Sequence, residues 1–166
     1  MKAKHVLKKL LACNDAINWV GERTIEEAWA ECERGDWMLW YYANVFPNNI
    51  RELTLAKAHC ANTVRHLMKD ERSLKAVDIA ISFGEGNISK DDLQVSASAA
   101  DAYASAADYA SAYAATAATT SAYAATAAAS AAAYSSVDAA AYVYAATENR
   151  KLTADICRKY LKLDGN

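Results

Sequence analysis

Apolar side chains recur at helical spacing near the N-terminus. They stand three or four positions apart at Val6, Leu10, Cys13, Ile17 and Val20. These steps place them on one stripe of an α-helix, and Gly21 follows as a residue at which helices commonly stop. The pattern predicts one amphipathic helix that ends at Gly21.

Capping signals mark the next two helices. Thr24 and Glu27 have the spacing of a capping box, so a second helix is expected to begin there and to end at Gly35. Asp36 is placed to cap a third helix, which Pro47 closes. One face of this third helix carries the aromatic side chains of Trp37, Trp40 and Tyr41.

Three more amphipathic helices are expected further along the chain. The first covers about 20 residues from Asn49, with the stripe Leu53, Ala56, Cys60, Val64 and Leu67. The second runs from about Asp70 to Gly84, and Ser89 and Asp92 then form another capping signal. The last helix closes the chain with a stripe of Leu152, Ile156, Tyr160 and Leu163.

Residues 89–147 are rich in alanine and tyrosine. Over residues 97–147 more than half of the positions are alanine, the strongest helix former, so the segment is expected to be helical. A single helix of ~50 residues would be ~75 Å long, out of proportion to the rest of the chain. We therefore expect it to fold back, at Thr119–Ser121 or at Ser135–Ser136, with small side chains that allow close packing.

These elements predict an all-α fold, a single-domain helical bundle. A chain of 166 residues with 54% apolar content is long enough for one buried core. In this prediction the amphipathic helices of residues 1–88 pack on the alanine- and tyrosine-rich helices of residues 89–147. Residues 148–166 then form the closing C-terminal helix.

The net charge of −2 points away from a nucleic-acid partner. The distribution is uneven, because residues 91–149 contain no lysine or arginine and six carboxylates: Asp91, Asp92, Asp101, Asp108, Asp138 and Glu148. No stretch is apolar enough to predict a membrane span, since alanine, serine and tyrosine are only weakly lipophilic.

The four cysteines are far apart and show no metal-ligand spacing. We expect Cys13, Cys32, Cys60 and Cys157 to be small buried residues in a reducing compartment, the cytoplasm. A secretion signal is not predicted, because Lys8 and Lys9 interrupt the apolar run that it would need.

The sequence offers no catalytic constellation. His59 and His66 are seven positions apart on one predicted helix, about 10.5 Å along its axis, which is too far to share a metal ion. Phosphate-binding loops, nucleophile elbows and zinc-binding HExxH motifs are missing from the sequence. We therefore expect a binding protein without enzymatic activity, cofactor or metal.

A resemblance to a known family rests on the sequence around the third predicted helix. The run GDWMLW, residues 35–40, follows Trp29 and Cys32, and downstream come RELTLAKAHCA at residues 51–61 and AVDIA at residues 76–80. Together with the closing helix, this pattern resembles the Imm-5-like immunity proteins of bacterial toxin-immunity loci and phage genomes, over residues 6–90 and 150–162. The resemblance implies a small cytoplasmic helical binder with no catalysis.

The candidate binding residues come from two parts of the chain. Burial in the core is the favoured role for the tryptophans, because exposing three indoles within twelve residues is unfavourable. In the alternative, Arg34, Asp36 and an indole edge line a pocket against the alanine-rich helices, whose phenols and carboxylates read a polar ligand. The candidate set is Arg34, Asp36, Trp37, Trp40, Asp101, Tyr103, Asp108, Tyr109, Tyr113 and Tyr123.

Three functions remain open at this point. In the first, an immunity-type inhibitor occludes a cognate protein toxin and presents carboxylates such as Asp101 and Asp108 to a basic cleft. In the second, a phage anti-defence protein binds a nucleotide-like immune signal, stacked on tyrosines, or a host defence factor. In the third, the alanine-rich helices pair between chains and form a homo-oligomeric assembly.

Overall fold

The computed structural model describes residues 2–68, 71–93 and 139–164, and these residues form an all-α fold, as predicted. They contain no β-strand; only an isolated bridge pairs Lys2 with Thr24. The helices are α1 (Ala3–Lys9), α2 (Asn14–Val20), α3 (Ile25–Glu31), α4 (Gly35–Val45), α5 (Ile50–Asn62), the 3-10 helix η1 (Arg65–Leu67), α6 (Glu71–Gly84) and α10 (Ala139–Tyr160).

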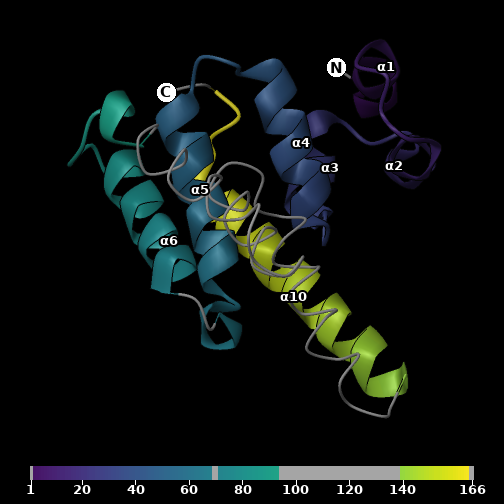
Figure 1. The fold of residues 1–166 in the computed structure, drawn as a ribbon. Coiled ribbons are helices and arrows are strands. Elements are labelled where there is room, and N and C mark those ends of the chain that lie inside the picture. The colour runs from purple at the N-terminus through teal and green to yellow at the C-terminus, as the bar shows by residue number, and fades with distance from the viewer. Residues whose placement is uncertain (1, 69–70, 94–138, 165–166) are drawn as a thin grey trace.

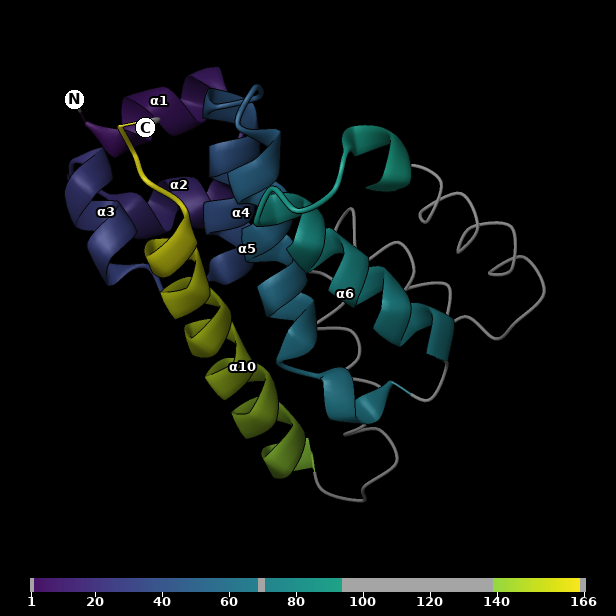
Figure 2. The same cartoon turned by 90° about the vertical axis from the view of Figure 1, so that its left-hand side faces the viewer.

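The helices form two groups that meet at α4. In the first group α5 lies between α6 and α10, and α10 packs against both α4 and α5 (Figures 1 and 2). In the second group α1, α2 and α3 lie together next to α4 (Figure 2). α4 therefore contributes one face to each group.

The first group is built on what we call the inner core. Small side chains let the helices approach closely there, since many of the buried positions are alanine or cysteine. The inner core consists of Cys32, Met38, Leu39, Tyr42, Ala56, Cys60, Ala154, Cys157 and Leu161. At Gly35 an added Cβ would stand only 2.4 Å from the Thr153 Oγ1 and 2.6 Å from the Thr153 carbonyl carbon. Glycine is therefore required where α4 begins, because the α10 backbone occupies the space of a side chain.

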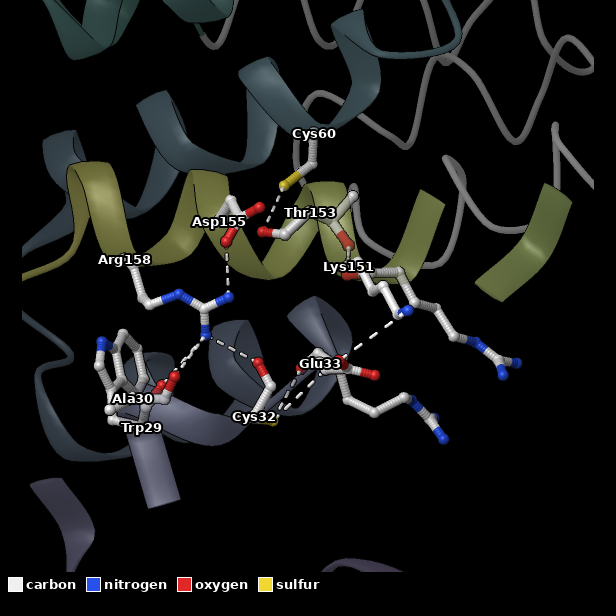
Figure 3. A network of polar contacts seen from close by, with 11 residues as sticks. Trp29, Ala30, Cys32, Glu33, Cys60, Lys151, Thr153, Asp155 and Arg158 are labelled. Atoms are coloured by element: carbon white, nitrogen blue, oxygen red, sulfur yellow. Dashed lines mark hydrogen bonds and ion pairs between the residues drawn. The ribbon is translucent and has the colours of Figure 1, made fainter. Parts of the chain in front are cut away.

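A polar network ties α10 to the end of α3 (Figure 3). The Arg158 Nη1 donates to the carbonyls of Trp29, Ala30 and Cys32 at 3.2, 3.3 and 2.8 Å. Its Nη2 donates to the Asp155 Oδ1 at 2.7 Å. A cation at a helix C-terminus satisfies carbonyls that lack an intrahelical partner and interacts favourably with the helix dipole. Arg158 thus fixes the position of α3 from a different part of the chain.

The second group has a separate apolar cluster, which we call the outer cluster. Its buried members are Ala3, Leu7, Ala16, Val20 and Ala28. The large side chains around this cluster, Trp19, Trp37 and Tyr41 among them, are only partly buried. Three of the five buried members are thus alanines, and the aromatic neighbours of the cluster keep part of their surface accessible.

The predicted single first helix is wrong, because the chain breaks between α1 and α2. The Leu11 N–H donates to the Lys8 carbonyl at 3.2 Å, and the Ala12 N–H donates to the Leu7 carbonyl at 3.0 Å. This pair of bonds is a Schellman motif, and Leu11 occupies its left-handed position with φ +59°. Because leucine occupies the position that is usually glycine, the spacing of the apolar residues did not indicate this helix end.

Other predicted boundaries shift for identifiable reasons. The capping box of Thr24 and Glu27 is confirmed, but α3 ends at Glu31 rather than at Gly35. Asp36 is not the cap of α4; it lies inside the first turn and pairs with Arg34 instead. The helix from Asn49 is shorter than expected, because α5 ends at Asn62 and only η1 follows.

The stripe predicted for the closing helix is only partly correct, because Ile156 and Tyr160 pack against the inner core but Leu152 does not. Leu152 is 49% exposed, whereas Ala154, Cys157 and Leu161 are buried. α10 also begins at Ala139, inside the segment predicted as alanine- and tyrosine-rich. The centre of its buried face is thus formed by the small residues Ala154 and Cys157, together with Leu161, which the predicted stripe did not include.

The capping signal at Ser89 is confirmed. The Asp92 N–H donates to the Ser89 Oγ at 3.2 Å, the Ser89 N–H donates to the Asp92 Oδ2 at 3.1 Å, and helix starts at Lys90. The predicted fold-back at Thr119–Ser121 or Ser135–Ser136 lies outside the described residues.

Candidate functional site

A cavity of about 560 Å³ lies between the second group of helices and α4. The outer cluster supplies one wall through Leu7, Ala16 and Ala28, and α4 supplies the other through Trp37 and Trp40. The α1–α2 turn contributes Leu11 and Cys13, and α5 contributes Lys57. A cavity of this size is in the range of small-ligand sites and can also take side chains of a partner protein.

Five aromatic side chains line the walls: Trp19, Trp29, Trp37, Trp40 and Tyr41. The rings of Trp19 and Trp37 meet edge to face, with centroids 6.0 Å apart, and Trp29 lies against Tyr41 at 6.1 Å. The predicted face of Trp37, Trp40 and Tyr41 on α4 is confirmed, since all three line the cavity. Met38, Leu39 and Tyr42 are buried in the inner core, although Met38 and Leu39 also reach the cavity lining. The amphipathic pattern of α4 therefore puts its aromatic face at the cavity, which the neighbouring core residues also border.

Arg34 and Asp36 form an ion pair at the edge of this aromatic wall. The Arg34 Nε donates to the Asp36 Oδ1 at 2.8 Å, and its Nη2 donates to the Asp36 Oδ2 at 2.5 Å. The hydrogen bond to Asp36 raises the pKa of Arg34 above its ordinary value. The guanidinium also lies 4.3 Å from the Trp37 ring centroid, a cation–π arrangement. Asp36 thus holds the guanidinium over an indole ring.

Two apolar side chains at the cavity are unusually exposed. Leu11 is 88% exposed and Trp40 is 38% exposed, and both line the cavity. Leu11 also has the left-handed backbone that leucine rarely adopts. A strained, exposed apolar residue beside a cavity is a common property of binding sites.

The cysteines divide into one exposed thiol and three buried ones. Cys13 is exposed and lines the cavity, so the prediction that all four are buried is wrong for this residue. The buried three behave as predicted. Burial raises the pKa of the Cys32 thiol, and a hydrogen bond with Cys60, together with burial, raises the pKa of Cys157. A thiol reagent is therefore expected to modify Cys13 and to spare the others.

Ionisable groups in the remaining wall are partly desolvated. Burial lowers the pKa of Lys57, which lines the cavity from α5. Burial, with a smaller effect of Glu26, raises the pKa of Tyr41. Both shifts show that water is partly excluded from this wall, which strengthens the polar contacts that a ligand would make there.

The two histidines that were predicted on one helix lie in different elements, His59 in α5 and His66 in η1. His59 stacks on Tyr160 of α10, with ring centroids 4.4 Å apart and an interplanar angle of 4°. His66 is exposed in η1. Within the described part of the chain, no three side chains of His, Cys, Asp or Glu are grouped as a metal site would require.

The structure brings four of the ten candidate residues together. Arg34, Asp36, Trp37 and Trp40 line one cavity, and its opposite wall is formed by α1–α3, which the sequence analysis did not select. Asp101, Tyr103, Asp108, Tyr109, Tyr113 and Tyr123 lie outside the described residues. Sequence reasoning missed Leu11, Trp19 and Lys57. The consecutive Leu10 and Leu11 were a usable signal, because neighbouring positions cannot share one helical stripe.

No similarity to a known protein bears on the function of this chain. Neither a protein-family model nor a curated protein nor a solved structure matches this chain. In the described ranges, none of the helices has the length and apolar character needed to cross a membrane.

Proposed function

We propose that this chain is a non-enzymatic binding protein of the immunity type, which neutralises a cognate protein toxin in the cytoplasm by occlusion. In this proposal the toxin docks over the cavity between α1–α3 and α4. The observation that carries it is the exposure of Leu11 and Trp40 at the cavity, next to the stacked Arg34.

The composition of the site supports a protein partner. Tryptophan, tyrosine and arginine are the residues that dominate binding energy at protein interfaces, and such residues cluster around pockets at interface centres. Trp37, Trp40, Tyr41 and Arg34 are grouped in this way. Burying an apolar side chain of a partner in the cavity would contribute about 1.5–3 kcal/mol. The family resemblance of the GDWMLW segment supports the same class of function.

Rescue of growth tests this proposal. The chain is co-expressed in bacteria with each protein encoded beside its gene. One of those proteins is expected to arrest growth when expressed alone, and the chain is expected to restore growth and to co-purify with it. The variants Leu11→Asp and Trp40→Ala are expected to lose rescue while keeping the melting temperature of the parent within a few degrees.

A matched control distinguishes the cavity from other exposed apolar surface. Leu152 on α10 is 49% exposed and does not line the cavity. Leu152→Asp is expected to retain full rescue. Rescue that survives Leu11→Asp and Trp40→Ala would contradict the proposal.

A small planar ligand is the second candidate, favoured by the cavity volume and by the guanidinium stacked on Trp37. A nucleotide-like immune signal could stack on Trp40 and contact Arg34, with the tyrosines at 109 and 113 as further predicted contacts. A ligand present at about 100 times its Kd would stabilise the protein by about 2.7 kcal/mol. A melting screen against cyclic and linear nucleotides measures this, and no shift with any of them would exclude this ligand class.

A further inference from the structure

We infer that Arg158 of α10 is a positioning residue of the binding site, although it does not line the cavity. From outside the cavity, α10 holds the α3–α4 loop, residues 32–34, in place, and this contact keeps Arg34 over Trp37 inside it. The inference concerns the site of the proposed function and rests on that function for the use of the cavity in binding.

Residues of α10 contact the chain at both ends of this loop. At its start, the Arg158 Nη1 donates to the Cys32 carbonyl at 2.8 Å (Figure 3). Just beyond its end, the Cys157 thiol donates to the Gly35 carbonyl at 3.6 Å. The backbone of Gly35 also lies so close to α10 that an added Cβ would be 2.4 Å from the Thr153 Oγ1. The loop is therefore fixed against α10 on both sides of Arg34.

Backbone contacts carry this constraint to Arg34 itself. The Arg34 N–H donates to the Cys32 Sγ at 3.4 Å, and the Cys32 thiol donates to the Arg34 carbonyl at 3.6 Å. The same carbonyl accepts from the Met38 N–H at 3.1 Å in the first turn of α4. With its backbone held in this way, Arg34 places its guanidinium 4.3 Å from the Trp37 ring centroid. The position of this cation in the cavity thus depends on contacts made outside it.

The Arg158 guanidinium also holds a second part of the cavity wall. Its Nη1 donates to the Trp29 carbonyl at 3.2 Å, and the Trp29 indole lies against Tyr41 in the cavity lining. The Asp155 Oδ1, 2.7 Å from the Arg158 Nη2, orients the guanidinium. A binding site weakens when its side chains are free to move by about 1 Å, even if each of them is still present. Replacing Arg158 should therefore weaken binding without removing any residue of the cavity.

Tryptophan fluorescence is a probe of this site that needs no partner. The chain has four tryptophans, and all of them line the cavity: Trp19, Trp29, Trp37 and Trp40. In the folded full chain, Arg158→Met is expected to shift the emission to longer wavelength and to increase quenching by acrylamide, because Trp29 and Trp37 become more accessible to water. The Kd of the partner recovered by growth rescue is expected to rise about tenfold.

Arg51 provides the matched control, because it holds another helix end in the same way. Its Nη1 donates to the carbonyls of Phe83, in the last turn of α6, and of Ile88, and none of these three residues lines the cavity. Arg51→Met removes contacts of the same kind and should keep the emission, the quenching and the Kd of the parent. If Arg158→Met does not fold, Arg158→Lys and Arg51→Lys are compared in the same way, with a smaller change expected for Arg158→Lys alone.

The outcomes separate this inference from the proposed function. Parent-like emission and quenching in folded Arg158→Met, or an equal change in Arg51→Met, would overturn the inference and leave the proposed function standing. A changed emission with an unchanged Kd would also overturn it, because Arg158 would then shape the cavity without affecting binding. Growth rescue that survives Leu11→Asp and Trp40→Ala contradicts the proposed function, whereas a changed emission in Arg158→Met still supports the hold of α10 on the cavity wall.

Discussion

The two faces of α4 are packed in opposite ways. Toward α10 and α5, its residues Met38, Leu39 and Tyr42 are buried in the inner core, and the backbone of Gly35 touches Thr153. Toward α1–α3, its residues Trp37 and Trp40 line a cavity of about 560 Å³. One face has no room for a methyl group, and the other leaves indoles accessible.

This difference locates stability and binding on different sides of one helix. Close packing of small residues gives the α4–α5–α10 side its rigidity, since interiors filled to crystal density resist deformation. The α1–α3 side holds an open volume and a strained leucine, which selection for stability alone would remove. We therefore assign the framework to the first side and the binding surface to the second.

Enlarging a side chain should have very different consequences on the two sides. Gly35→Ala places a Cβ about 2.4–2.7 Å from three Thr153 atoms, including the carbonyl carbon, and we expect a loss of about 3 kcal/mol in the free energy of unfolding. Ala12→Val enlarges a half-buried residue that lines the cavity, and we expect a change below about 0.5 kcal/mol. Urea denaturation measures both; equal losses would show that the cavity side is packed as tightly.

Replacing Arg158, which links α10 to the end of α3, should have the next largest effect on the free energy of unfolding. Arg158→Met removes the donor to the carbonyls of Trp29, Ala30 and Cys32 but keeps much of the side-chain volume. We expect a loss of about 2 kcal/mol, because hydrogen bonds from charged groups are lost at a helix end. Arg158→Lys retains the positive charge but lacks the planar guanidinium with its several donors, and its loss of unfolding free energy should be about half as large. Hydrogen exchange at α3 should accelerate in Arg158→Met, and unchanged exchange would contradict this role.

Two helix ends of the same type allow opposite changes, removal of a side chain at Leu11 and addition of one at Gly86. Leu11 and Gly86 both occupy the left-handed position of a Schellman motif, with φ +59° and +85°. Leu11→Gly should stabilise the protein by about 1 kcal/mol and weaken binding, because strain and an apolar contact are removed together. Gly86→Ala should destabilise it by about 1 kcal/mol without affecting binding. A destabilised Leu11→Gly would mean that this leucine supports the fold rather than the site.

The smallest effect is expected from acidification of the α5–α10 contact. Burial first, and Lys159 second, lower the pKa of His59 below its ordinary value of 6.5, with Glu85 opposing the shift. Because the folded pKa lies below the unfolded one, the neutral stacked form contributes stability above pH 6.5, and that stability is lost as pH falls through the folded pKa. His59→Phe keeps a ring against Tyr160 and should flatten this part of the pH profile of the unfolding free energy. An identical profile in the variant would exclude His59 as its source.

Local signals in the sequence predicted much of the fold. The capping boxes at Thr24 and Ser89, the stop at Pro47 and the aromatic face of α4 depend on residues within a few positions of each other. Such features are local, so propensity and spacing are enough to find them. The position of the aromatic face of α4 at the cavity follows from the same periodicity.

The predictions were wrong where contacts between residues far apart in the sequence determine the local structure. α3 ends at Glu31 because Arg158, far along the chain, satisfies its last carbonyls. Gly35 is a contact with Thr153 rather than a helix stop, and Asp36 pairs with Arg34 rather than capping. The cavity wall of α1–α3 could not be predicted, because it follows from how two helix groups meet at α4.

The central claim is that the partner binds over the cavity, and paired substitution of exposed leucines tests it most directly. The Kd of the partner recovered by growth rescue is measured by titration calorimetry for Leu11→Asp and for Leu152→Asp. The account predicts that Leu11→Asp raises the Kd at least tenfold, whereas Leu152→Asp leaves it within twofold, as expected for a change outside the interface. An unchanged Kd for Leu11→Asp, or an equal loss for both variants, would contradict it.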